Sequence, residues 1–203
     1  MKQPPHSLSD ITLSQWVDFQ NLYGEKLDNR LIEINNLQGE QKRNAYLLHQ
    51  FDSYCQKYSF YTGTPLEDIM RMESEDVLPI IKMQGESEIA YKKEQALLDY
   101  RAKIQWKGAI WKIQPIFPKT AQMTAAQFEM SQDIALIISD LQDGKHEALY
   151  ALCASYLRKI AEPYSEDLMN SRISLMKELP LSISLCVKMY MEWSINEYLK
   201  QSK

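Results

Sequence analysis

The chain has 203 residues, enough for one domain or two small ones. With 45% hydrophobic and 25% charged residues it can bury a core, which excludes disorder throughout the chain. The formal net charge of −4 argues against a general binder of nucleic acid or membranes, although a local basic patch stays open. There are only six glycines, which disfavours glycine-rich phosphate loops and turn-rich all-β folds.

The first half of the chain is predicted to be helical. Apolar residues recur at helical spacing over residues 13–35 and again over 40–61, and a proline at its start favours a short helix over 65–71. Residues 74–100 show no pattern that decides between helix and extended chain. We therefore expect an N-terminal helical region over residues 1–101.

A β-hairpin that connects the two helical halves is predicted within residues 102–118, with its turn at Lys107 and Gly108. In that register, the alternation of side chains along a strand places six apolar residues on one face, both tryptophans among them. Lys103 and Lys112 lie opposite each other on the other face. Because two like charges there repel each other, we expect water or an acidic partner over them.

The C-terminal part, residues 119–203, is expected to form an antiparallel helical bundle. Helical spacing and short polar breaks divide it into residues 124–141, 145–161, 165–178 and 180–200. The last of these helices is apolar nearly all round, so it either lies at the centre of a core or docks on a partner. The predicted fold class is therefore mainly α, with a helical N-terminal half, one central β-hairpin and a C-terminal bundle.

The sequence contains no catalytic constellation. Its three histidines and three cysteines lie far apart in the sequence, so the paired ligands of a zinc site are missing, and no phosphate-loop, dinucleotide or hydrolase motif is present. We expect no catalytic residue, no metal and no cofactor, and hence no enzyme. The N-terminus lacks the apolar core of a secretory signal and no stretch is long enough to span a membrane, which favours the cytoplasm.

Charge is segregated in the middle of the chain. Residues 64–90 hold seven acidic and two basic residues, whereas residues 92–119 hold seven basic and two acidic ones. The two segments either face each other or form ordinary solvated surface, or the basic hairpin docks on an acidic partner. Nucleic acid is a weaker candidate, because stacking tryptophans and phosphate-binding lysines would lie on opposite faces of the hairpin.

Several stretches of the sequence carry a resemblance to a known group of proteins. They are MTAAQF from Met123, HEALYALCASYLRK from His146, EPYSEDL from Glu162, LMKELPLSISL from Leu175 and WKGAIW from Trp106. With them the chain resembles tailed-bacteriophage tail proteins, or tail assembly chaperones, encoded near the tape-measure protein. The resemblance implies a non-enzymatic phage morphogenesis protein of the bacterial host cytoplasm, or of the virion, that binds helical segments of a tape-measure or tail-tube subunit.

Two sets of side chains are the candidate partner-binding residues. Met189, Tyr190 and Trp193 belong to the apolar last helix, and Lys103 and Lys112 belong to the outer face of the hairpin. Two alternatives stay open, a structural or connector protein of the virion and a nucleic-acid-binding protein that uses the basic hairpin. Self-association of the chain stays open as well.

Overall fold

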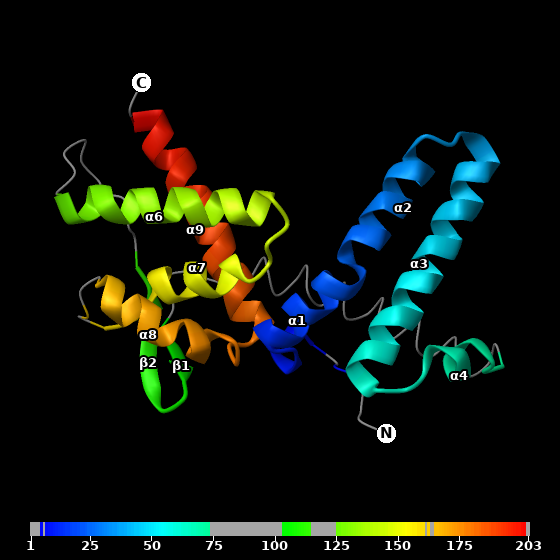
Figure 1. Cartoon of the computed structure of the whole chain (residues 1–203), viewed down its shortest axis with the longest axis horizontal. Helices are drawn as coiled ribbons and strands as arrows, with labels where there is room; N and C mark the ends of the chain where they lie inside the picture. The colour runs from blue at the N-terminus through cyan, green and yellow to red at the C-terminus, as the bar shows by residue number, and fades with distance from the viewer. Residues whose placement is uncertain are drawn as a thin grey trace. The chain divides into compact units, whose positions relative to one another are not determined.

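The computed structural model describes residues 5, 7–73, 103–114, 125–160, 162 and 165–201. These residues are mainly helical and include a small antiparallel sheet, which confirms the predicted mainly α fold class (Figure 1). The chain divides into two compact units, each described by itself below. The first comprises Met1–Ile11 and Gln15–Lys93, and the second comprises Thr12–Ser14 and Glu94–Lys203. The undecided segment 74–100 lies outside the described residues.

The first unit is built from helices. In chain order its elements are the 3-10 turn η1 (Leu8–Asp10), α1 (Leu13–Phe19, whose first two residues belong to the second unit), the π-helical turn η2 (Gln20–Gly24), α2 (Glu25–Asn35), α3 (Gly39–Thr62) and α4 (Leu66–Met70). The helices predicted over residues 13–35, 40–61 and 65–71 are confirmed, with one difference. The π turn η2 widens the helix between α1 and α2 and so rotates the apolar face of one relative to the other.

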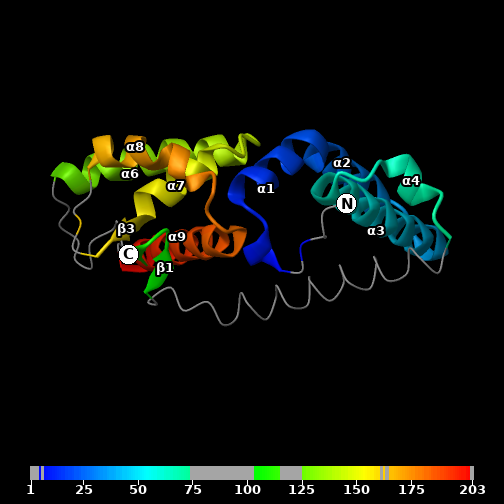
Figure 2. The ribbon, with the colours of Figure 1, turned by 90° about the horizontal axis from the view of Figure 1, so that it is seen from below.

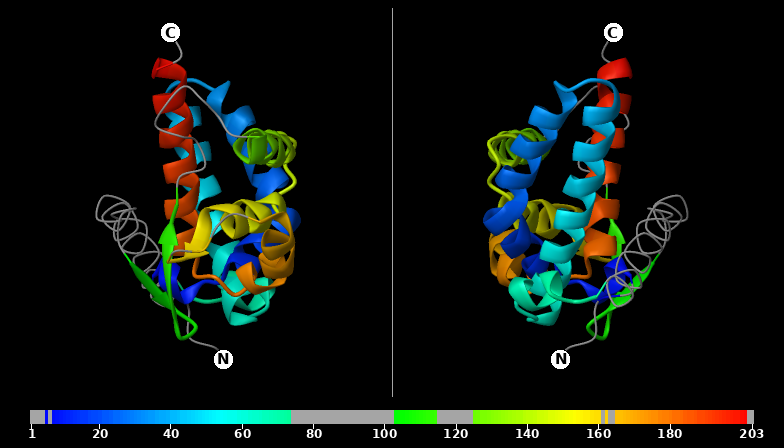
Figure 3. Two further views of the ribbon diagram at one scale, coloured as in Figure 1. Left: turned by 90° about the vertical axis from the view of Figure 1, so that its left-hand side faces the viewer. Right: turned by 90° about the vertical axis from the view of Figure 1, so that its right-hand side faces the viewer.

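The helices α2 and α3 form a helical hairpin and lie side by side (Figures 1 and 3). Gly63 ends α3 with a φ of 74°, a left-handed conformation in which its amide donates to the carbonyl of Ser59 at 2.9 Å. At this end of the hairpin, the ring of Phe19 packs against Tyr23 at 5.2 Å and against Phe60 at 5.5 Å between centroids. Aromatic packing thus closes the base of the hairpin.

The second unit contains the sheet. The strand β1 (Ile104–Trp106) pairs with β2 (Ala109–Ile113), and β2 pairs with β3 (Leu157–Lys159), both antiparallel and in the order β1-β2-β3. The third strand corrects the sequence prediction, which placed residues 157–159 inside a helix over 145–161. The hairpin is therefore part of a three-stranded sheet, in which β3 pairs with the edge of β2 that β1 leaves open.

The register of the hairpin is the one predicted from alternation. Ile104 pairs with Trp111, and Trp106 pairs with Ala109. The two turn residues between the strands have positive φ angles, 47° for the lysine and 70° for the glycine, as tight two-residue hairpin turns require. The indole N–H of Trp111 donates to the carbonyl of Trp106 at 2.9 Å and ties the two strands together across the apolar face.

Four described helices complete the second unit: α6 (Ala125–Gln142), α7 (Ala148–Tyr156), α8 (Glu166–Met176) and α9 (Leu181–Gln201). The helix α7 is central, because it packs on α6, α8 and α9 and buries seven of its nine residues. In Figure 2, α6 and α8 are seen on one side of α7 and α9 on the other. None of the helices described is both long and apolar enough to cross a membrane.

The short segment Thr12–Ser14 also belongs to the second unit. Thr12 forms an isolated antiparallel bridge with Pro180, and the amide of Leu13 donates to the carbonyl of Leu179 at 2.8 Å. The Leu13 side chain is fully buried, with 0% of its surface exposed. These contacts secure the turn that leads into α9, so the start of α9 has a fixed place in the unit.

Candidate partner-binding surfaces

The helix α9 has one buried and one exposed side. Val187 and Ser184 are fully buried, whereas Met189 is 42% and Trp193 is 47% exposed. The four-residue spacing of Met189 and Trp193 places them one above the other on the same stripe of the helix. A helix that is apolar nearly all round can thus fill the core on one side and offer apolar side chains to a partner on the other.

Tyr190 lies on the buried side of α9, with only 7% of its surface exposed. Its ring meets that of Tyr156 edge-on at 6.1 Å and that of Trp193 at 5.7 Å between centroids. The prediction of a direct partner contact for Tyr190 does not fit this burial, since a side chain that fills the core has little surface to offer. Tyr190 instead supports the exposed Trp193 from beneath.

A groove of about 370 Å³ lies beside this stripe, between α6 and α9. It is lined by Ile138, Leu141, Gln142, Lys188, Met191, Glu192, Ile195 and Asn196. The α6 side contributes the apolar pair Ile138 and Leu141, three residues apart, and α9 contributes Met191 and Ile195, four residues apart. Helical spacing on both walls gives the groove an apolar floor with polar residues at its rim. Ile138 and Leu141 share one face of α6 by their spacing, but the sequence contains no signal that this face lines a groove.

The sheet presents its lysines away from its tryptophans. Lys103 and Lys112 are exposed, and Lys112 pairs in register with Arg158 of β3. On the opposite face, Trp111 is 2% exposed and Trp106 packs against it at 5.6 Å between ring centroids. The lysines therefore form a second surface, on the sheet, separate from the apolar stripe of α9.

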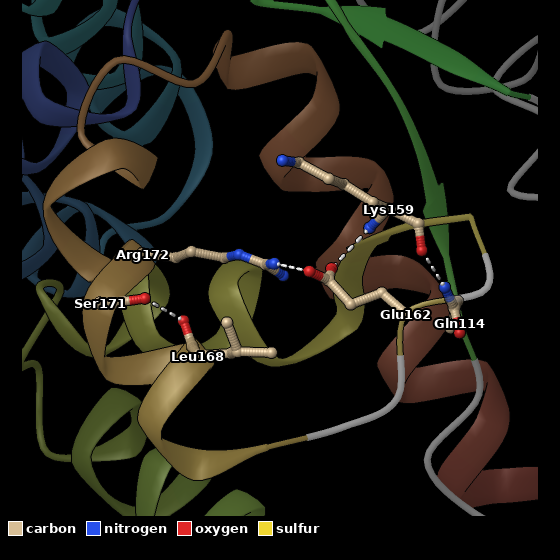
Figure 4. Close-up of polar contacts among 6 residues, drawn as sticks. All are labelled: Gln114, Lys159, Glu162, Leu168, Ser171 and Arg172. Atoms are coloured by element: carbon tan, nitrogen blue, oxygen red, sulfur yellow. Dashed lines mark hydrogen bonds and ion pairs between the residues drawn. The ribbon is translucent and has the colours of Figure 1, made fainter.

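A partly buried ion pair joins the end of the sheet to α8 (Figure 4). Arg172 of α8 reaches the carboxylate of Glu162, and their side chains are only 10% and 18% exposed. The other carboxylate oxygen of Glu162 accepts from the amide of Lys159 at 3.0 Å, and the amide group of Gln114 donates to the carbonyl of Lys159 at 3.0 Å. The end of β2, the end of β3 and α8 are thus connected by one hydrogen-bonded chain.

The charges of this cluster decide the protonation of Glu162. Burial alone would raise the pKa of its carboxyl, but the hydrogen bonds from Arg172 and from the Lys159 amide, with the charges of both residues, lower the pKa overall. Two cations also flank the ring of Trp111, with the Arg172 guanidinium at 5.3 Å and the Lys159 ammonium at 5.8 Å from its centroid. Trp111 is therefore enclosed and has no free face for stacking.

The chemistry available elsewhere in the described residues is limited. The thiols of Cys55, Cys153 and Cys186 are all free and buried. Burial raises the pKa of the Cys153 thiol to about 12, although a hydrogen bond with Ser184 opposes the shift, so the reactive thiolate is scarce near neutral pH. Within the described part of the chain, no three histidine, cysteine, aspartate or glutamate residues gather in a way that could hold a metal ion.

Comparison with protein-family models, with curated proteins and with solved structures found no match for this chain.

Proposed function

We propose that this chain is a non-enzymatic protein that captures an amphipathic helical segment of a partner protein on the exposed side of α9. The observation that carries the proposal is the stripe of Met189 and Trp193, exposed at 42% and 47%, directly beside the groove between α6 and α9. The sequence resemblance supplies the biological setting, in which the partner is a phage tape-measure or tail-tube subunit.

The geometry suits a helical ligand. An amphipathic helix presents apolar side chains three, four and seven residues apart, and such side chains fit a groove whose two walls are helices. Met191 and Ile195 line the α9 wall of the groove. The exposed stripe of Met189 and Trp193 lies on the same helix, on the other side of the polar rim. Tryptophan is enriched among residues that dominate binding energy, and the flexible thioether of methionine adapts to different partners.

Polar residues at the rim would set the register of the bound helix. Lys188, Glu192 and Asn196 follow each other at four-residue steps along α9, and Lys188 and Glu192 carry opposite charges. A partner helix with charges of the opposite order along one flank would satisfy both, whereas a uniformly charged flank would be repelled by one of them.

Pull-down of the tagged full chain, co-expressed with the genes that flank its own, tests this proposal. The double variant Met189→Ala/Trp193→Ala removes the stripe, and Leu136→Ala is the matched control because Leu136 is 67% exposed on α6 and does not line the groove. We expect a long helical partner to be retained by the wild type and the control. Loss of a tryptophan hot spot of about 2 kcal/mol would weaken capture roughly 30-fold in the double variant.

Circular dichroism melts of the same three proteins distinguish a lost surface from a lost fold. An unchanged melt with lost capture supports the proposal. If the double variant unfolds, the two side chains belong to the core and the assignment of this surface is wrong. If the double variant and the Leu136→Ala control capture the partner equally well, the partner binds elsewhere.

A further inference from the structure

The outer face of the sheet has its own chemistry, independent of α9. The register pairs Gln105 with Ile110. Continued one residue beyond the start of β1, the same register puts Lys103 opposite Lys112, on the same face as Gln105 and Ile110. On the third strand, Arg158 pairs with Lys112, although only 8% of Arg158 is exposed. The part of this face that a partner can reach therefore consists of two neighbouring lysines, the exposed Gln105 and the 49% exposed side chain of Ile110.

The sheet is uniformly basic where it is described. Residues 103–114 and 157–159 contain five lysines and arginines and no aspartate or glutamate. Lys107 at the turn is engaged, since its ammonium pairs with Glu178, and the ammonium of Lys159 lies over the ring of Trp111. Among the residues described, no acidic side chain forms an ion pair with Lys103 or Lys112. Two like charges that face each other across antiparallel strands destabilise the pair unless an anion or water screens them.

We propose that this face, Lys103, Lys112 and Ile110, binds an acidic segment of a protein partner. Carboxylates of the segment would lie over the two ammonium groups and relieve their mutual repulsion, while an apolar side chain of the segment would cover Ile110. Charge complementarity of this kind raises association rates and makes binding sensitive to salt.

A protein segment fits this face better than nucleic acid does. Single strands bind through aromatic rings that stack on bases among basic residues. Here Trp106 and Trp111 lie on the opposite face, and Trp111 is 2% exposed beneath the cations of Arg172 and Lys159. The apolar residue exposed next to the lysines is the aliphatic Ile110, which offers an apolar contact and no stacking platform.

Fluorescence anisotropy of the full chain with labelled poly-L-glutamate tests the proposal at low ionic strength. The double variant Lys103→Gln/Lys112→Gln removes the two charges. Its matched control is Lys26→Gln/Arg43→Gln, which removes two exposed charges from α2 and α3 and changes the net charge equally. We expect the hairpin variant to bind about 5-fold more weakly than the wild type, because it loses two exposed charge interactions. The affinity of the control should stay within about 2-fold of the wild-type affinity.

Two further arms complete the experiment. An oligothymidine with the same number of charges should bind more weakly than poly-L-glutamate, and Met189→Ala/Trp193→Ala should leave poly-L-glutamate binding unchanged because that stripe is a different surface. The proposal is overturned if the wild type does not bind poly-L-glutamate, if the two charge variants lose binding equally, or if the oligothymidine binds more tightly. The last outcome would identify the face as a nucleic-acid surface.

Discussion

Replacement of Arg172 by methionine should destabilise the second unit by removing one partner of a partly buried ion pair. The Arg172 and Glu162 side chains are 10% and 18% exposed, so the carboxylate left behind would be largely out of water. Breaking a buried pair in this way typically costs about 3–5 kcal/mol. Glu162 is only partly buried and retains the hydrogen bond from the Lys159 amide, so the expected loss is at most the lower end of that range, about 3 kcal/mol. Methionine preserves the apolar stem of the arginine, so the loss reports on the charge.

Urea denaturation followed by tryptophan fluorescence measures this loss. Three of the four tryptophans, Trp106, Trp111 and Trp193, lie in the second unit, so the signal reports chiefly on that unit. A double-mutant cycle with Glu162→Gln isolates the pair itself. We expect the double variant to be about 2 kcal/mol more stable than the sum of the single losses predicts. If the two losses add within about 0.5 kcal/mol, the side chains do not interact and the cluster does not hold α8 to the sheet.

Three other predictions follow from burial and charge. The folded-state pKa of Glu162 lies below the ordinary 4.5, so its contribution to stability is present above that value and is lost as the pH falls through the lowered pKa. The unfolding free energy of the wild type should therefore drop more steeply in acid than that of Arg172→Met. Parallel curves of unfolding free energy against pH would contradict this. In urea denaturation, Tyr190→Ala should lower the free energy of unfolding of the second unit by about 3 kcal/mol or more, whereas Trp193→Ala should lower it by less than about 1 kcal/mol. A reversed order would mean that the buried side of α9 has been misidentified. The buried Cys153 should resist alkylation in the native protein and react in urea, as peptide mass mapping would show, and rapid native labelling would refute its enclosure.

The sequence predicts local structure better than it predicts contacts between distant segments. The hairpin register follows from alternation alone, since only one register places the apolar residues on one face. The strand Leu157–Lys159 continues a stretch of helical apolar spacing, and three residues are too few for a pattern of their own. Its extended conformation depends on pairing with β2, more than forty residues earlier in the chain, so it was predicted as helix.

The site shows the same division between local pattern and tertiary packing. The apolar composition of α9 indicates that the helix has a special role, but composition does not say which side is buried. Met189 and Tyr190 are neighbours in sequence, yet they are 42% and 7% exposed, because Tyr190 points to Tyr156 of α7. Spacing along a single helix contains no information about which of its sides faces another helix.

The helix α3 gives a second example in the first unit. Apolar residues recur at helical spacing over residues 40–61, and Leu48 and Cys55, seven residues apart, fall on one stripe of that helix. In the structure Cys55 is 1% exposed while Leu48 is 63% exposed. A stripe with helical spacing is thus buried at one end and open at the other, because burial depends on how far the neighbouring elements extend along the helix.

Site-specific photo-crosslinking tests the central claim, the capture of a helical segment on α9, most directly. A benzophenone side chain placed at position 189 of the full chain, co-expressed with the genes that flank its own, should form an adduct with a helical segment of one partner. The same side chain at position 136, on α6 and away from the groove, should not form it. Adducts at apolar residues three, four or seven apart in that partner would match the proposed geometry. Equal adducts at both positions, or none at position 189, would contradict it.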